Sequence, residues 1–401
     1  MTRQFAVLVV GGGPVGVVTA LACAQRGFRV TLLEAEDKVD ASPRAATTHP
    51  STLEIIAGLG LFQRFVAEGL VARHFQFWDR VTRTLICEFD HDVLRDETPY
   101  PFVVQTEQHK LANLGIEELR GRTDCAVHFS MRVTNLEQDA DGVQVFAQGP
   151  DGPRKFGAHW VVGADGGRST VRKLLGIEFE GYTWPERFIV LTTTDDFQRV
   201  LGCCYRSYFA DPVEWTNLFK VTGDDYKGRW RAVFPTRADE TDEEALSDTA
   251  VRARMGRVLP SAENFAVVHR NLYKVHQRVA ANFRKGRVFL AGDAAHVNNP
   301  IGGLGLNCGI HDALELAETL RAVALEGVDA GLLDRYEHRR RPLNIQYVQE
   351  QTIANKKRLE ERDPHARVAR FAELRAIAAD PERHKQFLMR TSLIESVRKV
   401  H

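Results

Sequence analysis

The sequence lacks any long apolar segment and has no excess of either charge. Its 401 residues contain no apolar run of about 18 residues, which is roughly what a bilayer-spanning helix requires. Lys and Arg together number 53, as do Asp and Glu, so the formal net charge is zero. This balance gives no electrostatic reason to expect a nucleic acid or an anionic membrane as a partner.

The cysteines and histidines form neither a disulfide framework nor a metal motif. No two of the six cysteines are spaced as Cys-x-x-Cys, and the adjacent pair Cys203-Cys204 has poor geometry for a disulfide. None of the 14 histidines are spaced as His-x-x-x-His. The N-terminal sequence MTRQFAVLVVGGG also lacks a secretory pattern. We therefore predict a cytoplasmic protein without a metal, and its state as monomer or homodimer is left open.

A strand, a glycine turn, a helix and a second strand open the chain. Phe5–Val10 is continuously apolar, as expected of a strand covered on both faces, and leads into Gly-Gly-Gly-Pro-Val-Gly. A helix over Val15–Arg26 and a strand ending at Glu34 complete the pattern of a dinucleotide site. Glycines admit a pyrophosphate, the helix N-terminus favours negative charge, and the acid accepts from ribose hydroxyls. The predicted contacts are Gly11, Gly13, Pro14, Val15, Gly16 and Glu34.

A second glycine junction follows a strand-like segment that ends at Ala164. Asp165-Gly166-Gly167 reads as a turn, and Ser169 is a plausible cap for a helix over 170–175. An isolated Asp-Gly is usually a simple turn. Here Arg168 and Arg172 also make the segment basic, which would suit neighbouring phosphates.

A third junction lies near residue 290. A short apolar strand, 287–291, ends in Gly292-Asp293, and a stretch rich in glycine leads into an amphipathic helix. Asp293 can accept hydrogen bonds from the hydroxyls of a polyol, and Gly302, Gly303, Gly305 and Gly309 let the main chain lie against a flat ligand. A nucleotide end at the first junction and a polyol-and-ring end at the third describe FAD better than NAD alone.

The three junctions resemble those of the single-component flavoprotein aromatic hydroxylases, of the para-hydroxybenzoate hydroxylase type. The segments that carry this resemblance are GGGPVG with Glu34, GADGGRSTVRK, and GRVFLAGDAAH with NPIGGLGLN. Their order and approximate spacing are similar to those of the family through about residue 350. HQRVAANFRKGRVFLAGDAAH and FEGYTWPERFIV look similar to hydroxylases of phenolic acids, of the 3-(3-hydroxyphenyl)propionate hydroxylase type.

The resemblance implies a mixed α/β fold. A Rossmann-like FAD-binding domain of the glutathione-reductase type would carry an inserted β-sheet substrate domain and C-terminal helices. The expected FAD-binding domain is discontinuous, over 1–74, 106–178 and 276–350. The substrate domain would comprise 75–105 and 179–275, and a charged helical segment, broken at Asp363-Pro364 and Asp380-Pro381, would occupy 351–401.

The resemblance also implies further cofactor contacts. Arg44 matches an arginine that contacts the cofactor, and Gln105 matches a glutamine near the ribityl chain. Asp165 lies in an Asp-Gly motif that the family uses with both cofactors, and Asp293 matches the aspartate that binds the ribityl chain. The loop and helix start expected against the isoalloxazine ring include Pro300, Gly303, Gly305, Leu306 and Asn307.

The segment 180–275 alternates apolar and polar residues and is the expected floor of a substrate pocket, together with 75–89. Candidates for its lining are Tyr205, Tyr208, Trp215, Phe219 and Phe234, although each is more simply explained as sheet core. Arg206 could hold a substrate carboxylate, although a surface position is the simpler interpretation. Pro300, Tyr205, Arg206 and Tyr208 are the candidate catalytic residues. His49 and His296 invite a general-base role, but packing against the cofactor is favoured for His296.

These observations predict an FAD-dependent monooxygenase. It would use NADPH or NADH and O2 to hydroxylate a phenolic or heteroaromatic substrate through a flavin hydroperoxide. Only one G-x-G-x-x-G is present, which fits a nicotinamide that binds transiently. A flavin-dependent reductase or oxidase of the same fold, and a non-enzymatic flavin-binding protein, remain as alternatives.

Overall fold

A six-stranded sheet carries the glycine junctions in the computed structural model, which describes residues 5–44, 46–260 and 264–400. The strand order is β18-β19-β12-β1-β2-β8, and all neighbours except β18 and β19 run parallel. Their Val- and Leu-rich sequences suit a parallel sheet that is covered on both faces. The strands are β1 (Ala6–Val10), β2 (Arg29–Leu33), β8 (Cys125–His128), β12 (Trp160–Gly163), β18 (Arg284–Lys285) and β19 (Val288–Leu290).

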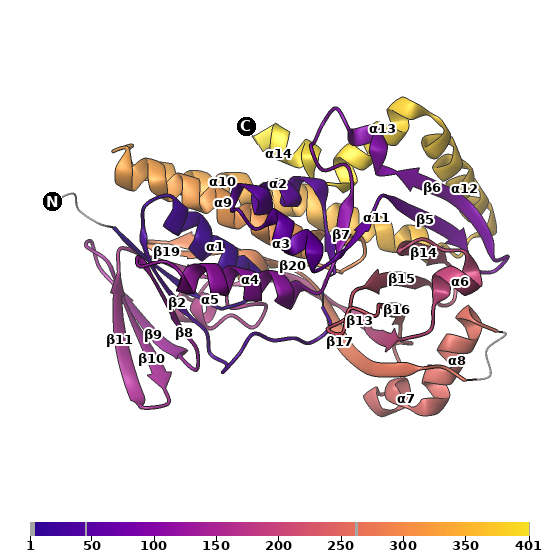
Figure 1. Cartoon of the computed structure of the whole chain (residues 1–401), viewed down its shortest axis with the longest axis horizontal. Helices are drawn as coiled ribbons and strands as arrows, with labels where there is room; N and C mark the ends of the chain where they lie inside the picture. Colours follow the sequence, from indigo (N-terminus) through magenta and orange to yellow (C-terminus); the bar gives the residue numbers. More distant parts are fainter. Residues whose placement is uncertain (1–4, 45, 261–263, 401) are drawn as a thin grey trace.

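Three long helices pack together beside this sheet. Helix α1 (Pro14–Gln25) contacts both α4 (Gln108–Arg120) and α9 (Leu304–Leu325) (Figure 1). A Cβ atom at Gly115 of α4 would lie 2.3 Å from the side chain of Val17, so glycine is what allows α4 to approach α1 so closely. The first helix, the expected βαβ unit and the mixed α/β fold are therefore present as predicted.

The carboxyl ends of the parallel strands meet at one edge of the sheet. Val10 of β1 is paired with Gly163 of β12, which is paired in turn with Leu290 of β19. Ligands of open parallel sheets bind outside this edge. A Cβ atom at Gly292 would lie 3.0 Å from the side chain of Val15, so the third junction touches the first helix. The three junctions, far apart in sequence, are therefore neighbours in space.

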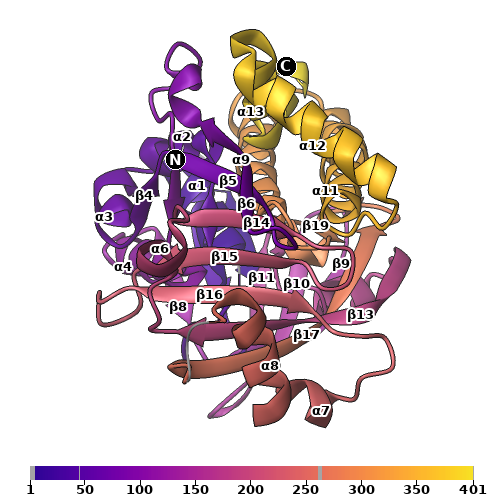
Figure 2. The same cartoon turned by 90° about the vertical axis from the view of Figure 1, so that its right-hand side faces the viewer.

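A larger, eight-stranded sheet has the order β20-β17-β13-β16-β15-β14-β5-β6. Helices α7 and α8 cover one face, where Phe197, Trp230 and Met255 form a core, and the C-terminal helices cover the other (Figure 2). The strands and these two helices are β5 (His74–Asp79), β6 (Thr84–Asp90), β13 (Phe179–Thr193), β14 (Arg206–Ala210), β15 (Thr216–Val221), β16 (Arg229–Pro235), β17 (Val267–Ala280), β20 (His296–Val297), α7 (Asp242–Leu246) and α8 (Asp248–Val258).

The C-terminal segment is helical and packs against the eight-stranded sheet. Helix α11 contacts β14, α12 contacts β6 and α13 contacts the short η1 helix. Asp363 and Asp380 cap α12 and α13, each with a proline at the first helical position, so both predicted breaks are confirmed. The elements are α10 (Leu333–Leu343), the π-helix η4 (Asn344–Gln349), α11 (Glu350–Leu359), α12 (Pro364–Ala379), α13 (Pro381–Thr391) and α14 (Ile394–Val400).

The remaining elements connect these parts. Two three-stranded sheets have the orders β11-β10-β9 and β3-β7-β4. The elements are β3 (Thr47–Thr48), β4 (Leu70–Ala72), β7 (Val103–Gln105), β9 (Arg132–Gln138), β10 (Val143–Gly149), β11 (Gly152–Ala158), α2 (Pro50–Gly58), α3 (Phe62–Ala67), α5 (Thr170–Leu174), α6 (Phe197–Leu201), η1 (His91–Leu94), η2 (Gly292–Ala294) and η3 (Ala330–Leu332).

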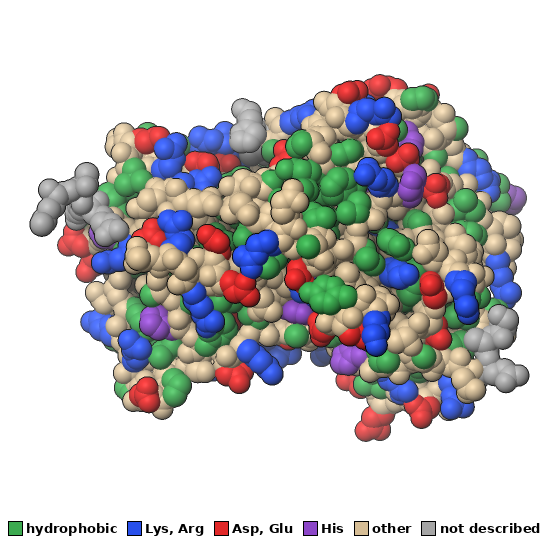
Figure 3. All heavy atoms as spheres, viewed as in Figure 1, with side chains coloured by type: hydrophobic (Ala, Val, Ile, Leu, Met, Phe, Trp, Pro, Cys, Tyr) green, Lys and Arg blue, Asp and Glu red, His purple; other side chains and the backbone are tan. Residues whose placement is uncertain are grey.

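The surface carries both signs of charge. Figure 3 shows Lys, Arg, Asp and Glu side chains interspersed on the face in view, as the zero net charge suggests. Among the described residues, no helix is both long enough and apolar enough to cross a membrane. The predicted domain boundaries stay a prediction. Strand β20 lies within the predicted FAD-binding ranges and pairs with β17 in the eight-stranded sheet, so the two parts interleave.

Candidate functional site

The first glycine junction is closely packed on one side and open on the other. Gly11 has a φ of +112°, and a Cβ atom there would lie 2.4 Å from the carbonyl oxygen of Ala164. A Cβ atom at Gly16 would lie 2.0 Å from the carbonyl oxygen of Gly11. At Gly13 it would meet nothing within 4 Å, at the point where α1 begins with Pro14. An anion can therefore approach the free N–H groups at the start of α1.

Glu34 lies beside this junction at the end of β2. Its carboxylate accepts hydrogen bonds from the backbone N–H groups of Gly12, at 2.6 Å, and Glu36, at 2.8 Å. These two bonds fix the carboxylate, and its remaining lone pairs can accept from the hydroxyls of a ribose. The structure thus places Glu34 where the sequence pattern predicted it.

Asp165, at the second junction, caps helix α5. Its carboxylate accepts from the Ser169 hydroxyl at 2.5 Å and from the backbone N–H groups of Thr170 and Val171 at 2.7 and 3.1 Å. Ser169 in turn accepts from the N–H of Arg172, so its predicted cap is confirmed. Asp165 therefore has a structural role, and its contact with a cofactor stays a prediction.

Arg172 joins the second and third junctions. Its guanidinium donates 2.8 Å hydrogen bonds to the carbonyl oxygens of Gly167 and Ala294, and it lies buried over the ring of Phe179. Two of the Arg172 donors are thus used within the protein, and the suggestion that this basic turn neighbours a phosphate stays a prediction. Arg168 is exposed.

Asp293, at the third junction, is surrounded by protein, but its side chain is accessible to solvent on one side. Desolvation by its surroundings raises the pKa of the carboxyl group, although the side chain is exposed on one side. None of the described residues forms a hydrogen bond with this carboxylate. Its acceptor positions are therefore available to a ligand, as expected for a residue that binds polyol hydroxyls.

A buried ion network lies directly beneath Asp293. Asp312 accepts from the backbone N–H of Gly292 at 3.1 Å, from Arg340 Nε at 2.6 Å, and contacts His296 Nε2 at 2.6 Å. Burial opposes ionisation of Asp312, but the charges of Arg340 and His296 lower its pKa well below the usual value. His296 thus bonds to Asp312 within the protein. The packing role against the cofactor that the sequence favours stays a prediction.

The glycine loop between β20 and α9 is held by side-chain contacts. Gly302 and Gly303 have φ values of +108° and +68°, and Pro300 is exposed before them. Asn307 donates to the carbonyl oxygens of Thr47 and Gly303 at 2.9 and 2.6 Å. Gly305 and Leu306 lie half-buried in the first turn of α9. Asn307 therefore anchors the loop, and a direct contact with the flavin by any of these residues stays a prediction.

Two further buried side chains lie near this loop: His49 bonds to it directly, and Gln105 bonds to Thr47, which lies against Gly303. His49 Nε2 lies 3.0 Å from the carbonyl oxygen of Gly302, so this nitrogen carries the proton. Desolvation and then the positive charge of Arg206 lower the pKa of His49 well below its usual value, which keeps it neutral. Gln105 accepts from the Thr47 hydroxyl at 2.6 Å. His49 therefore positions the loop and is a poor general base.

Arg44 lies on the surface near the sheet. Its side chain is 56% exposed and pairs with Asp40 at 2.8 Å, while its carbonyl oxygen accepts from the buried Arg231 at 3.0 Å. The main chain at Arg44 is thus fixed to the eight-stranded sheet. Among the described residues, the partners of its guanidinium are this exposed carboxylate and Ser42, so the group is accessible to a ligand.

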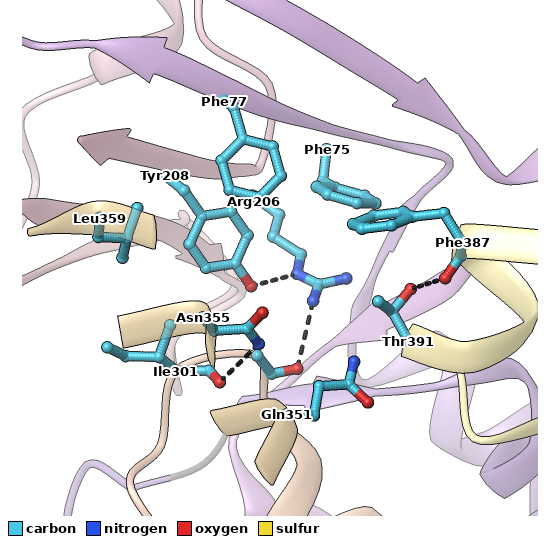
Figure 4. Close-up of a pocket in the computed structure, with 11 residues that line it drawn as sticks. Phe75, Phe77, Arg206, Tyr208, Ile301, Gln351, Asn355, Leu359, Phe387 and Thr391 are labelled. Atoms are coloured by element: carbon cyan, nitrogen blue, oxygen red, sulfur yellow. Dashed lines mark hydrogen bonds between the residues drawn. The ribbon is translucent and has the colours of Figure 1, made fainter. Parts of the chain in front are cut away.

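An aromatic pocket lies between the eight-stranded sheet, the glycine loop and the C-terminal helices (Figure 4). Strands β5 and β14 supply three aromatic side chains and Arg206, the loop supplies Ile301 and Gly302, and α11 and α13 close the remaining sides. The lining residues are Phe75, Phe77, Arg206, Tyr208, Ile301, Gly302, Gln351, Asn355, Leu359, Phe387 and Thr391.

Arg206 is the only charged residue that lines this pocket within the described chain. Its side chain is buried, so the expectation of a surface arginine is wrong. Nε donates to the Tyr208 hydroxyl at 2.9 Å and Nη2 donates to the carbonyl oxygen of Gly302 at 3.2 Å. No Asp or Glu of the described residues forms an ion pair with Arg206, and its Nη1 group has no hydrogen-bond partner among them. A buried guanidinium without a counterion favours an anionic ligand.

Four of the predicted lining residues lie outside the pocket. Side chains alternate along β14, so Arg206 and Tyr208 face the pocket whereas Tyr205 faces away. Trp215 is buried against Phe188, and the remaining two lie elsewhere in the sheet: Phe219 supports Tyr208 from outside, and Phe234 is in the core under α8. The simpler interpretation, sheet core, is therefore the better one for Trp215 and Phe234.

Sequence reasoning missed the contribution of the C-terminal helices. Gln351, Asn355 and Leu359 lie four residues apart on one face of α11, and Phe387 and Thr391 have the same spacing on α13. This i, i+4 spacing is visible in the sequence. It marks a packed face in any helix, so it gave no signal for a pocket.

The comparisons with known proteins agree with this geometry. A family model described as FAD binding domain matches residues 4–351. Para-nitrophenol 4-monooxygenase of Pseudomonas sp. (strain WBC-3) is 36% identical over 390 residues, which cover 96% of this chain and 94% of that protein. The crystal structure of p-nitrophenol 4-monooxygenase from Pseudomonas putida DLL-E4 superposes with a TM-score of 0.91 at 34% identity, and 99% of each chain is covered.

A longer relative shows more distant similarity. The 3-(3-hydroxy-phenyl)propionate/3-hydroxycinnamic acid hydroxylase of Mycolicibacterium smegmatis is 33% identical over 345 residues. These residues cover 84% of this chain but 58% of that protein. The chain is therefore similar to a phenolic-acid hydroxylase, as the sequence motifs suggested. Both the identity and the covered share of that protein are lower than for the nitrophenol monooxygenase.

Proposed function

The chain belongs to the FAD binding domain family, as a single-component flavin-dependent aromatic monooxygenase, and we propose that it hydroxylates a small phenol bound beside Arg206. The observation that carries this proposal is the position of that arginine. Its guanidinium is buried among aromatic rings and donates to Gly302 of the glycine loop, so the pocket adjoins the loop directly.

The residues at the sheet edge fit FAD. The open backbone at Gly13 and the start of α1 would hold the pyrophosphate, and Glu34 would accept from the ribose of the adenosine half. Asp293, which has no partner among the described residues, would accept from the ribityl hydroxyls. The segment from Pro300 to Asn307 would lie against the isoalloxazine ring. The bound cofactor, reduced by NAD(P)H, supplies an activated oxygen atom from O2.

The pocket residues prepare the substrate for this chemistry. Arg206 favours the ionised form of a bound phenol and so increases the electron density of its ring. The rings of Phe75, Phe77 and Tyr208 provide apolar faces that orient an aromatic substrate. Helices α11 and α13 cover part of the pocket, and this cover would limit the access of water to the reacting atoms.

The experiment is to purify the protein, record its flavin spectrum and measure NADH, NADPH and O2 consumption with a panel of phenols that includes 4-nitrophenol. We expect a phenol to stimulate consumption and to yield a product that contains one more oxygen atom. Stimulation without that product would indicate uncoupled oxidase activity. A flavin spectrum without stimulation by any aromatic compound would favour the reductase or the non-enzymatic alternative.

A further inference from the structure

The pocket contains a second polar group that has no partner. Gln351 of α11 is 7% exposed and lines the pocket. Its Oε1 atom is enclosed by protein without a hydrogen bond, and neither amide atom forms one with any other described residue. Figure 4 shows the amide nitrogen directed into the pocket, toward the side of Arg206.

The neighbouring polar side chains are satisfied by protein groups. Asn355 donates to the carbonyl oxygen of Ile301 at 3.2 Å and accepts from Arg358 at 2.9 Å. Thr391 donates to the carbonyl oxygen of Phe387 at 3.0 Å. Buried amides in native proteins are nearly always hydrogen-bonded, and an unpaired one lowers stability unless a ligand completes it.

We propose that Gln351 is a specificity-determining residue, which donates a hydrogen bond from Nε2 to an acceptor substituent on the substrate ring. This inference rests on the proposed function. Arg206 binds the phenolate oxygen, and Gln351 binds a second polar substituent, such as a nitro, carbonyl or carboxylate group. The substrate class is therefore a phenol that carries a second, hydrogen-bond-accepting group, and simple alkylphenols fit less well.

Position supports this assignment. Gln351 comes from α11, whereas Arg206 comes from β14, so the two polar groups enter the pocket from different elements. The π-helix η4, Asn344–Gln349, immediately precedes Gln351, and such segments occur frequently at functional sites. No acidic side chain lines the described pocket, so nothing there repels an electron-rich substituent.

The test uses the FAD-loaded protein and two ligands, 4-nitrophenol and 4-methylphenol, whose binding is measured by perturbation of the flavin spectrum. We expect Gln351→Leu to raise the Kd of 4-nitrophenol about tenfold, because a site built to bond a polar group loses that bond. The Kd of 4-methylphenol should stay unchanged or fall. For each phenol, the Kd of the variant is divided by the Kd of the wild-type protein. The difference in acidity between the two phenols therefore does not affect the comparison.

Gln346→Leu is the matched control, because this glutamine precedes α11 on an exposed surface. It should change neither Kd. Gln351→Met, an unbranched variant, should repeat the Gln351→Leu result if the leucine variant is poorly folded. An equal loss for both ligands would assign Gln351 to packing and overturn the inference, as would no change for either. If neither phenol binds the wild-type protein, the proposed function itself fails.

Discussion

The guanidinium of Arg206 and the carbonyl oxygen of Gly302 are joined by a hydrogen bond of 3.2 Å. His49 Nε2 lies 3.0 Å from the same carbonyl oxygen. Because Arg206 belongs to the pocket and Gly302 to the glycine loop, this bond connects the proposed substrate pocket to the loop that we propose lies against the flavin. An anion can bind the Nη1 group of Arg206, which has no partner among the described residues, while Nη2 keeps its bond to the Gly302 carbonyl.

Arg206→Met should weaken phenolate binding about 10- to 100-fold, since a hydrogen bond to a charged group contributes about 1.5–3 kcal/mol. The bound form of 4-nitrophenol is a direct readout, because only the anion is strongly coloured. In the wild-type protein the bound phenol should ionise at a lower pH than the free phenol, and this difference should disappear in Arg206→Met. Arg206→Lys keeps the positive charge, so the difference in ionisation between bound and free phenol should be partly retained. An unchanged ionisation in the methionine variant would contradict the assignment.

Asp293→Ala should reduce FAD affinity by about tenfold or more through the loss of hydrogen bonds to the cofactor. It should not lower the stability of the FAD-free protein, since this carboxylate bonds to none of the described residues and its desolvation disfavours the charged form. Asp165→Ala should instead destabilise the FAD-free protein by about 1 kcal/mol, because it removes caps from α5. FAD titration and urea unfolding of both variants separate these effects. If both variants are destabilised equally in the absence of FAD, the assignment of a ligand-binding role to Asp293 and a structural role to Asp165 is wrong.

Asp312→Asn should lower the free energy of unfolding by about 3–5 kcal/mol, because it leaves Arg340 buried without its counterion. Asp334→Asn is the matched control. Asp334 also pairs with an arginine, Arg284, but its side chain is 60% exposed, so the loss should be below about 1 kcal/mol. Chemical denaturation at neutral pH gives both values. Similar losses in the two variants would show that burial of the Asp312 pair is unimportant.

Stability should fall as the pH is lowered from about 6.5. Desolvation, together with a nearby arginine, lowers the pKa of His91 and His311 to about 3, and His49 is also lowered. These imidazoles bind protons when the chain unfolds, so the unfolded state gains protons below its pKa of about 6.5 and becomes favoured. Each of these histidines lowers the free energy of unfolding by up to about 1.4 kcal/mol for each pH unit below about 6.5.

Urea unfolding between pH 4.5 and 7 measures this slope. His311→Gln, which can keep a hydrogen bond to Ser51, should reduce the slope by about the contribution of one proton. A slope that is identical in the variant and the wild-type protein would show that His311 is not neutral in the folded state.

The cofactor side of the molecule could be predicted from the sequence because each of its parts is contiguous. Gly11 to Gly16, Asp165 to Ser169 and Asp293 to Asn307 each combine a strand end, glycines and a helix start within about 15 residues. Such segments impose their own backbone geometry, through positive φ angles and close approaches that only glycine allows. Their meeting at one sheet edge follows from the rules of parallel sheets.

The pocket could not be predicted in the same way. Phe75, Arg206, Gln351 and Phe387 lie on four elements far apart in sequence, and each residue type is ordinary for its element. The burial of Arg206 depends on α11 and α13, which cover β14 only after the chain has folded. Charge and helical spacing in 351–401 indicated helices, but they did not indicate which surface those helices cover.

Helices α11 and α13 form one wall of the pocket, and they follow the glycine junctions in the sequence. The glycine junctions proposed to bind FAD end before residue 351, whereas much of the wall of the proposed substrate pocket comes from residue 351 onward. We therefore expect mutational libraries restricted to Gln351, Asn355, Phe387 and Thr391 to alter the preferred substrate without disturbing the glycine junctions. For protein engineering, this carboxy-terminal wall is the part of the pocket that can be replaced while all three glycine junctions are left intact.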